Sequence, residues 1–248
     1  MKNKDLKISL LFAMVGLMAG ASTAMYQYQI YDQATKEAII SQLGSIEVLL
    51  SVSAMQTGIM AFVASFIGLK LARKSNLSLN FKYSKDSFLS AVVIAFLVAL
   101  IISVSEKFIF AQYMPENLTG TYKFNLIYLL TGVLYGGIIE ELMLRLLIMS
   151  LAVVILMKLF KVYDESIRPW MYAAAIIISS LLFAAGHLPF ASQMFGLSVP
   201  IVVRVLVLNS VGGLGYGYLY WKKGLAYSIL AHMLTHVFNQ LLLLPLLF

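Results

Sequence analysis

The chain contains no cysteine among its 248 residues. A disulfide, a thiolate nucleophile and a cysteine-ligated metal site are therefore excluded. Charge is also scarce, because Asp, Glu, Lys and Arg make up 12% of the chain, whereas an average soluble domain has about 25%. Apolar residues account for 61%. This imbalance indicates an integral membrane protein rather than a soluble domain.

The apolar runs are long enough for helices that cross a bilayer, which need roughly 20 residues. The alternating segments of a membrane β-barrel are not apparent, so we predict an all-α, polytopic protein with a single membrane domain over 1–248. Seven spans are expected, at 8–25, 46–69, 88–105, 125–157, 170–187, 199–221 and 224–246. The count rises to eight if 26–45, otherwise an amphipathic surface helix, or part of 125–157 forms another helix. We expect the long fourth span to tilt, kink at Gly136-Gly137 or split.

The net charge of +7 does not indicate nucleic-acid binding, because the basic residues lie in short loops between the spans. With the N-terminus in the cytoplasm, 13 of the 18 basic residues fall on the inner side. They are Lys2, Lys4, Lys7, Lys70, Arg73, Lys74, Lys82, Lys85, Lys158, Lys161, Arg168, Lys222 and Lys223. Three lysines (36, 107 and 123) fall outside, as does a glycosylation sequon at Asn117. The positive-inside rule thus predicts an inner N-terminus and an outer C-terminus.

Two adjacent glutamates, Glu140 and Glu141, interrupt the most apolar part of the chain. Carboxylates inside a bilayer are costly and are usually functional. Glu141 and Arg145 are four residues apart and share a helix face, whereas Glu140 points about 100° away. One reading is a buried charge cluster that fixes helix packing. Two acids against one arginine favour the other reading, in which Arg145 neutralises Glu141 and Glu140 is free for chemistry.

All three histidines of the chain lie in apolar segments. His187 precedes Leu188-Pro189, and a proline normally ends a helix just before it, so this histidine is expected near a helix end. His232, His236 and Asn239 have the i, i+4, i+7 spacing of one helix face. Such a polar stripe must face protein or water rather than lipid. Its simplest role is hydrogen bonding between helices, an interpretation that stays open for Asn239.

Together these groups can support peptide hydrolysis. A glutamate in an apolar site can act as a general base, and histidines can share water activation and stabilisation of the oxyanion. A glutamate with three histidines is also a workable zinc set, although the H-E-x-x-H motif is absent. Buried acids and histidines occur in proton-coupled transporters as well, but no inverted repeat is apparent here.

Three segments, in this order, resemble the signature of the CPBP family of intramembrane proteases, which includes CAAX prenyl endopeptidases and the bacterial Abi proteins. They are Glu140-Glu141-Leu-Met-Leu-Arg145, Phe183-Ala-Ala-Gly-His187, and a third motif that begins at His232. The resemblance covers about 130–240, so we place the catalytic core at about 125–245. The third motif departs from the family pattern, because His236 stands where the family has asparagine. Either His236 or Asn239 could supply the missing donor.

The resemblance implies an intramembrane endopeptidase in which Glu140 activates water with help from His187. His232 and the group at position 236 would stabilise the oxyanion, while Glu141 and Arg145 would orient the site, together with Phe183 and Asn239. It further implies metal-independent chemistry without a cofactor, with zinc as the alternative.

We expect membrane lipid as a partner, and as substrate a membrane-associated peptide or protein, such as a bacterial peptide precursor. The expected location is a bacterial cell membrane, crossed several times. The main alternative function is a non-catalytic immunity or scaffold protein, and a proton-coupled transporter is a further one.

Overall fold

The computed structural model describes residues 2–114, 123–163 and 166–248, and within them the chain forms helices and no strands. The sequon at Asn117 lies outside the described residues. The α-helices are α1 (Lys2–Ile30), α2 (Gln33–Leu43), α3 (Ile46–Lys74), α4 (Lys85–Ser105), α5 (Leu126–Thr131), α6 (Ser150–Leu159), α7 (Pro169–Gly186), α8 (Leu188–Phe195), α9 (Val199–Lys223), α10 (Leu225–Phe238) and α11 (Leu244–Leu247). The other helices are η1 (Glu106–Phe110), η2 (Ala111–Tyr113), η4 (Gly132–Glu140), η5 (Leu142–Met149) and η7 (Asn239–Leu243).

Seven of the described helical stretches are long and apolar enough to cross a membrane. They are Asn3–Ile30, Ile46–Lys74, Lys85–Tyr113, Leu126–Leu159, Pro169–Phe195, Val199–Lys223 and Leu225–Leu247. Each contains or overlaps one expected span, so the multi-pass, all-α architecture is confirmed. The segment 26–45 adds no eighth span: its helix α2 has 11 residues and buries none of them, too few to cross a bilayer.

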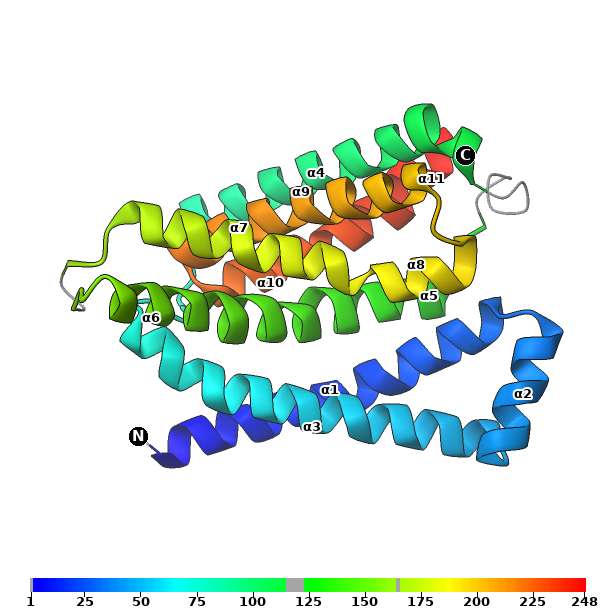
Figure 1. The fold of residues 1–248 in the computed structure, drawn as a ribbon, viewed down its shortest axis with the longest axis horizontal. Coiled ribbons are helices and arrows are strands. Elements are labelled where there is room, and N and C mark those ends of the chain that lie inside the picture. Colours follow the sequence, from blue (N-terminus) through cyan, green and yellow to red (C-terminus); the bar gives the residue numbers. More distant parts are fainter. Residues whose placement is uncertain (1, 115–122, 164–165) are drawn as a thin grey trace.

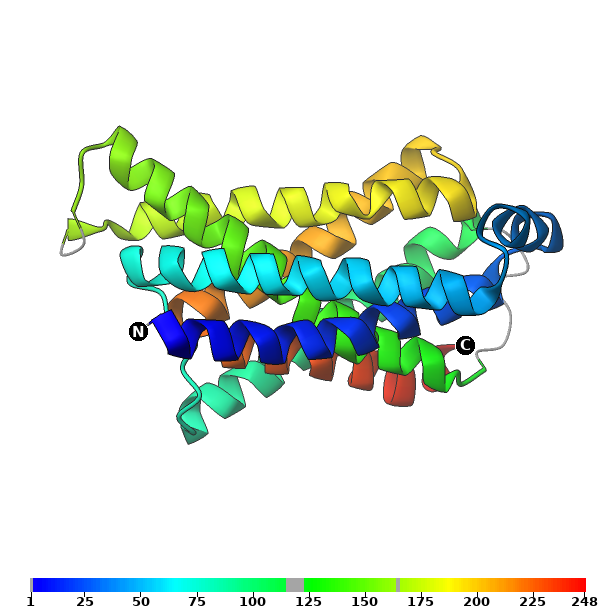
Figure 2. The ribbon, with the colours of Figure 1, turned by 90° about the horizontal axis from the view of Figure 1, so that it is seen from below.

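The spans lie roughly parallel or antiparallel to one another in the long direction of the molecule (Figure 1). α1 and α3 pack together on one side, and α2 joins their ends (Figures 1 and 2). α4, α7, α9 and α10 form the rest of the bundle, and the helix from α5 to α6 contacts both groups. The long central helix therefore lies between the α1–α3 pair and the other spans.

Two ion pairs tie one end of the bundle together. Asp5 of α1 pairs with Arg73 of α3 at 2.6 Å, and Lys223 of α9 pairs with Asp86 of α4 at 2.5 Å. The chain's N-terminus lies at this end and the C-terminus at the other (Figure 1). We call the first the basic end, because the lysines and arginines of the N-terminus and of the α3–α4, α6–α7 and α9–α10 connections lie there. The opposite end is called the far end.

The fourth span is one helix of 34 residues, Leu126–Leu159. It is not split, but its winding changes: η4 and η5 have the wider π-helical turn, with Glu141 between them. The expected kink site, Gly136-Gly137, lies inside η4. Such π segments are rare and are frequently found at functional sites.

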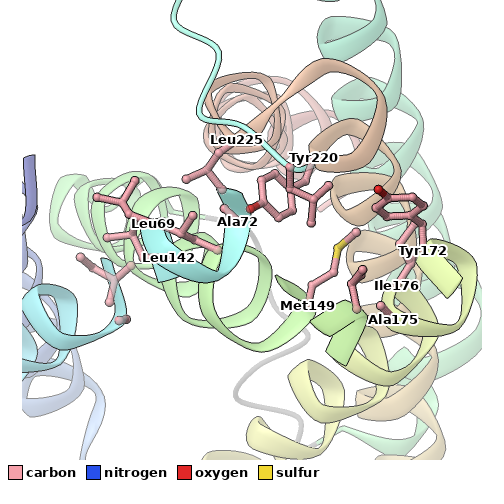
Figure 3. Close-up of a cluster of buried hydrophobic side chains, with 14 of the residues drawn as sticks. Leu69, Ala72, Leu142, Met149, Tyr172, Ala175, Ile176, Tyr220 and Leu225 are labelled. Carbon is pink, nitrogen blue, oxygen red and sulfur yellow. The ribbon is translucent and has the colours of Figure 1, made fainter. Parts of the chain in front are cut away.

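The main apolar core surrounds the half of this helix that runs toward the basic end. Leu142 and Met149 are completely buried against Leu69 of α3, Ile176 of α7 and Leu225 of α10 (Figure 3). Burying side chains of this size stabilises the fold by about 1.5–3 kcal/mol each when water is the alternative. The core therefore fixes the helix that carries the glutamates.

Glycines allow α9 to approach α7 closely, as the Gly213-x-x-x-Gly217 spacing predicts. A Cβ atom added at Gly213 would lie 2.7 Å from Ser180 Cβ, and one at Gly217 would lie 2.9 Å from Ile176 Cγ2. The sixth span thus packs directly against the helix that ends at His187. This contact also brings the Gly213 carbonyl into the protein interior.

Candidate active site

The candidate residues from three distant segments come together around one cavity of about 480 Å³. The cavity is lined by Glu140 from η4, His187 after α7, and His232 and His236 from α10. Phe183 and Asn239 also line it. Glu141 and Arg145 do not, and both are completely buried behind the cavity wall.

Glu140 is the carboxylate that faces the cavity. Its side chain is 14% exposed, with Oε1 3.6 Å from His187 Nε2 and Oε2 3.9 Å from His232 Nε2. Both separations exceed a direct hydrogen bond, and polar groups at such distances are commonly bridged by water. The two carboxylate oxygens thus face two different imidazoles.

His187 lies at the junction of α7 and α8, at the helix end that Pro189 predicts. Its Nδ1 is 2.8 Å from the carbonyl oxygen of Phe183. A carbonyl oxygen only accepts, so Nδ1 carries the proton. The Phe183 ring packs edge-on against the imidazole, with the ring centroids 4.7 Å apart. Phe183 therefore fixes the orientation in which Nε2 points at Glu140.

Glu141 is held by groups from two helices. His232 Nδ1 lies 3.0 Å from its Oε1, and Arg145 Nε lies 3.5 Å from its Oε2. Ser228 Oγ lies 2.5 Å from the same Oε2 and 2.8 Å from the carbonyl oxygen of Tyr216, so one hydroxyl proton serves two acceptors. The expected neutralisation of Glu141 by Arg145 thus has its geometric basis, with two further partners.

Arg145 lies between aromatic rings in the protein interior. Its guanidinium carbon is 5.1 Å from the ring centroid of Phe183 and 5.9 Å from that of Tyr216. Nη2 donates a hydrogen bond of 3.1 Å to the Gly213 carbonyl oxygen. Because a buried charge needs such partners, the arginine links the fourth, fifth and sixth spans behind the cavity.

His232 is oriented on both faces of its ring. Tyr216 stacks on it with ring centroids 4.3 Å apart, and His236 stacks on it at 5.2 Å. The hydrogen bond from Nδ1 to Glu141 leaves Nε2 directed toward the cavity. Its position and tautomer are therefore set by neighbours on three helices.

His236 rather than Asn239 is the direct neighbour of His232. A Cβ atom at Gly136 would lie 2.6 Å from His236 Nε2 and 3.5 Å from His232 Nε2, which places both nitrogens against the same glycine. Asn239 lies one turn further on, where α10 changes to the π-helical η7, and its Oδ1 is buried without a hydrogen-bond partner.

Glu140 and the three histidines are the side chains that could contribute to a zinc site. In the part of the chain that the structure describes, no three or more His, Cys, Asp or Glu side chains are arranged to hold a metal ion.

Four contributors to the site did not stand out from the sequence as site residues. Ser228 precedes His232 by one helical turn, so the two side chains share a helix face. Because His232 contacts Glu141, this spacing could have indicated that Ser228 does so too. Gly132 and Gly136 are also needed, because a Cβ atom at either position would lie 2.6 Å from a His236 ring nitrogen. No sequence motif indicated that Tyr216 belongs to the site, since this residue lies in another span.

Comparison with known proteins gives one match. Residues 122–238 match the family model described as Type II CAAX prenyl endopeptidase Rce1-like. No curated protein and no solved structure matches the chain. The matched residues include all three motifs of the cavity, with the glutamate pair, His187 and His232. The segment that carries the site is therefore similar to the CAAX-type endopeptidases that this family model describes.

Proposed function

We propose that this multi-pass membrane endopeptidase hydrolyses its peptide bond with water activated by Glu140. The single observation that carries the proposal is the position of the Glu140 carboxylate. It faces the cavity between two imidazoles, with Nε2 atoms 3.6 and 3.9 Å away, whereas Glu141 is buried and engaged. A carboxylate within reach of a bound water is what a general base needs.

In the first step, Glu140 takes a proton from water while the water oxygen attacks the peptide carbonyl carbon. His187, protonated on Nδ1, accepts the other hydrogen bond of that water at Nε2 and so orients it. The carbonyl π bond breaks and its electron pair moves to the oxygen. The negative charge that develops needs donors already in place.

His232 and His236 supply these donors in the proposal. For His232 to donate from Nε2, its ring must carry both protons, a form that the Glu141 carboxylate at Nδ1 stabilises. His236 donates beside it, in the position that the family motif gives to asparagine. In the second step, the oxyanion collapses, the carbon–nitrogen bond breaks, and Glu140 returns its proton to the leaving amine.

The remaining residues position these groups. Phe183 orients His187, while Arg145 and Ser228 hold Glu141, which in turn orients His232. Asn239 extends the polar wall beyond His236. We propose no cofactor, and as substrate a membrane-associated peptide or protein in a bacterial cell membrane.

Cleavage is tested with cells that carry the wild type, Glu140→Gln, or the control Glu37→Gln, an exposed acid of α2. Membrane and secreted peptides are compared by mass spectrometry at equal protein levels. We expect a peptide that the wild type and Glu37→Gln process equally and that Glu140→Gln processes at least about 100-fold more slowly. Cleavage of that peptide by purified protein should be unchanged by a metal chelator.

Two outcomes would contradict the proposal. Processing by Glu140→Gln at the wild-type rate would remove the glutamate mechanism and favour a scaffold or immunity protein. Ion or solute flux in liposomes without any cleavage would favour a transporter. Loss of cleavage with the chelator, restored by zinc, would overturn the metal-independent chemistry alone.

A further inference from the structure

The cavity lies in the half of the bundle near the far end. α1 begins at the basic end, and the residues that it contributes to the cavity come from its last third, such as Gln27. α9 runs in the opposite direction, and Asn209 in its first half lines the cavity. Tyr128 near the start of α5 and Phe190 of α8 complete this outer part.

Toward the basic end, the cavity is closed. Glu141, Arg145, Leu146 and Met149 follow Glu140 along the helix, and each is 0% exposed. Beyond them, Tyr220 of α9 forms a buried hydrogen bond of 2.9 Å with a serine of α6. The cavity extends one helical turn past Glu140, to Met143 and Leu144. Below that turn the layers are filled with buried side chains, which leaves the half of the bundle near the far end as the route to Glu140.

The two ends differ strongly in charge. The basic end carries most of the lysines and arginines of the chain, whereas the described far end carries Lys36, Lys107 and Lys123 together with acids that include Asp32, Glu37 and Glu47. Lysine and arginine are enriched in cytoplasmic loops. The basic end is therefore the cytoplasmic one, and the cavity belongs to the outer half of the membrane.

The outer wall of the cavity has little charge. Apart from Glu140 and the three histidines, the side chains that line it are uncharged, with tyrosines, threonines, amides and apolar groups. The one arginine of the neighbouring α9 segment, Arg204, is taken up by an ion pair with Glu106. A charged substrate segment would lose its hydration here without gaining a partner, and that is costly.

We propose that the site takes its substrate from the outer side of the membrane, as an uncharged stretch of a peptide chain already carried across or anchored there. The location of the entry follows from the cavity and the charges alone. The identity of the occupant as a peptide rests on the proposed protease function. A cytoplasmic peptide tail would be excluded from the site by the packed layers beneath Glu140.

The absence of cysteine makes a direct test possible, because a single introduced thiol is the only one among the 248 residues. Asn209→Cys places a thiol in the cavity. Gln42→Cys on exposed α2 marks the far end, and Ser166→Cys in the exposed α6–α7 connection marks the basic end. Each variant is treated with a membrane-impermeant maleimide in intact cells and in inverted vesicles. The thiols left unreacted are then counted by a gel shift.

We expect Asn209→Cys and Gln42→Cys to react at least tenfold faster in intact cells, and Ser166→Cys to react faster in inverted vesicles. Reaction of Asn209→Cys from the same side as Ser166→Cys would overturn the outer entry. So would reaction of both Asn209→Cys and Gln42→Cys only in inverted vesicles.

A second cavity variant, Gln27→Cys, keeps the test decisive if Asn209→Cys does not accumulate. A thiol that reacts in detergent but from neither side of sealed membranes, in both cavity variants, would also overturn the proposal. Thiol labelling requires no proteolysis. A labelling result that contradicts entry from the outer side would therefore leave the glutamate mechanism untouched.

Discussion

At the scale of single residues, the two adjacent glutamates differ in their surroundings. Glu140 is 14% exposed and has no ion pair shorter than 3.6 Å. Glu141 is 0% exposed and lies within 3.5 Å of Arg145, His232 and Ser228. A glutamate side chain therefore faces the cavity at position 140, whereas at position 141 it contacts Arg145, His232 and Ser228 behind the cavity wall.

Glu141→Gln should destabilise the protein. The amide keeps the size of the side chain but leaves Arg145 as an uncompensated buried charge, and breaking such a pair costs about 3–5 kcal/mol. We expect the unfolding temperature of the purified protein in detergent to fall by about 10 °C.

Glu140→Gln is the matched control for this measurement, because it makes the same change one residue earlier. Its unfolding temperature should stay within about 2 °C of the wild type. Equal losses in both variants would contradict the division of roles between the two glutamates.

At the scale of elements, the contact between η4 and α10 decides how the imidazoles of His232 and His236 lie. The glycine face of η4 lies directly against His236, and Met233 Cγ would lie 2.3 Å from a Cβ atom at Gly137. The π-helical winding sets which residues share this face. The two helices can therefore place two imidazoles side by side only because the face has no side chains.

Gly136→Ala should lower the cleavage rate more than it lowers stability. The new methyl group would lie 2.6 Å from His236 Nε2, so the imidazole must move. A displacement of about 1 Å in a reacting group can cost about 100-fold in rate. Cleavage of the identified peptide by purified variants is the measurement.

Gly186→Ala controls for the effect of a methyl group in a helix near the site, since no atom lies within 4 Å of the added Cβ. It should retain the unfolding temperature and lose less activity than Gly136→Ala. A Gly136→Ala enzyme with the wild-type rate would show that His236 does not hold the reacting group.

At the scale of the whole molecule, seven spans place the termini on opposite sides of the membrane. This odd number follows from the described helices, with α2 too short to cross. From the charge difference between the two ends we expect the N-terminus to lie inside.

Reporter fusions should show this arrangement. Alkaline phosphatase, which is active only outside the cytoplasm, should be active when fused after Phe248, and a fluorescent protein fused before Met1 should be fluorescent in the cytoplasm. Inactive phosphatase at the C-terminus, with the fusion protein present at normal levels, would contradict either the span count or the direction.

The sequence by itself determined the membrane class and the seven spans, and it predicted side chains for a candidate site. Apolar runs of bilayer length are a local property, so spans such as 46–69 and 199–221 could be placed within a few residues. The side chains quoted from the three motifs also meet at one cavity or directly behind it. Intramembrane charge is rare enough that Glu140, Glu141 and Arg145 were visible without a structure.

Only the tertiary structure decided how these groups face one another. The π-helical winding around Glu141 and the stacking of Tyr216 on His232 depend on packing between helices that are far apart in the sequence. The choice between His236 and Asn239 as the neighbour of His232 depended on the glycine face of another span. The side from which the cavity is reached likewise required the closed layers beneath Glu140, because burial is a property of the assembled bundle and not of any one helix.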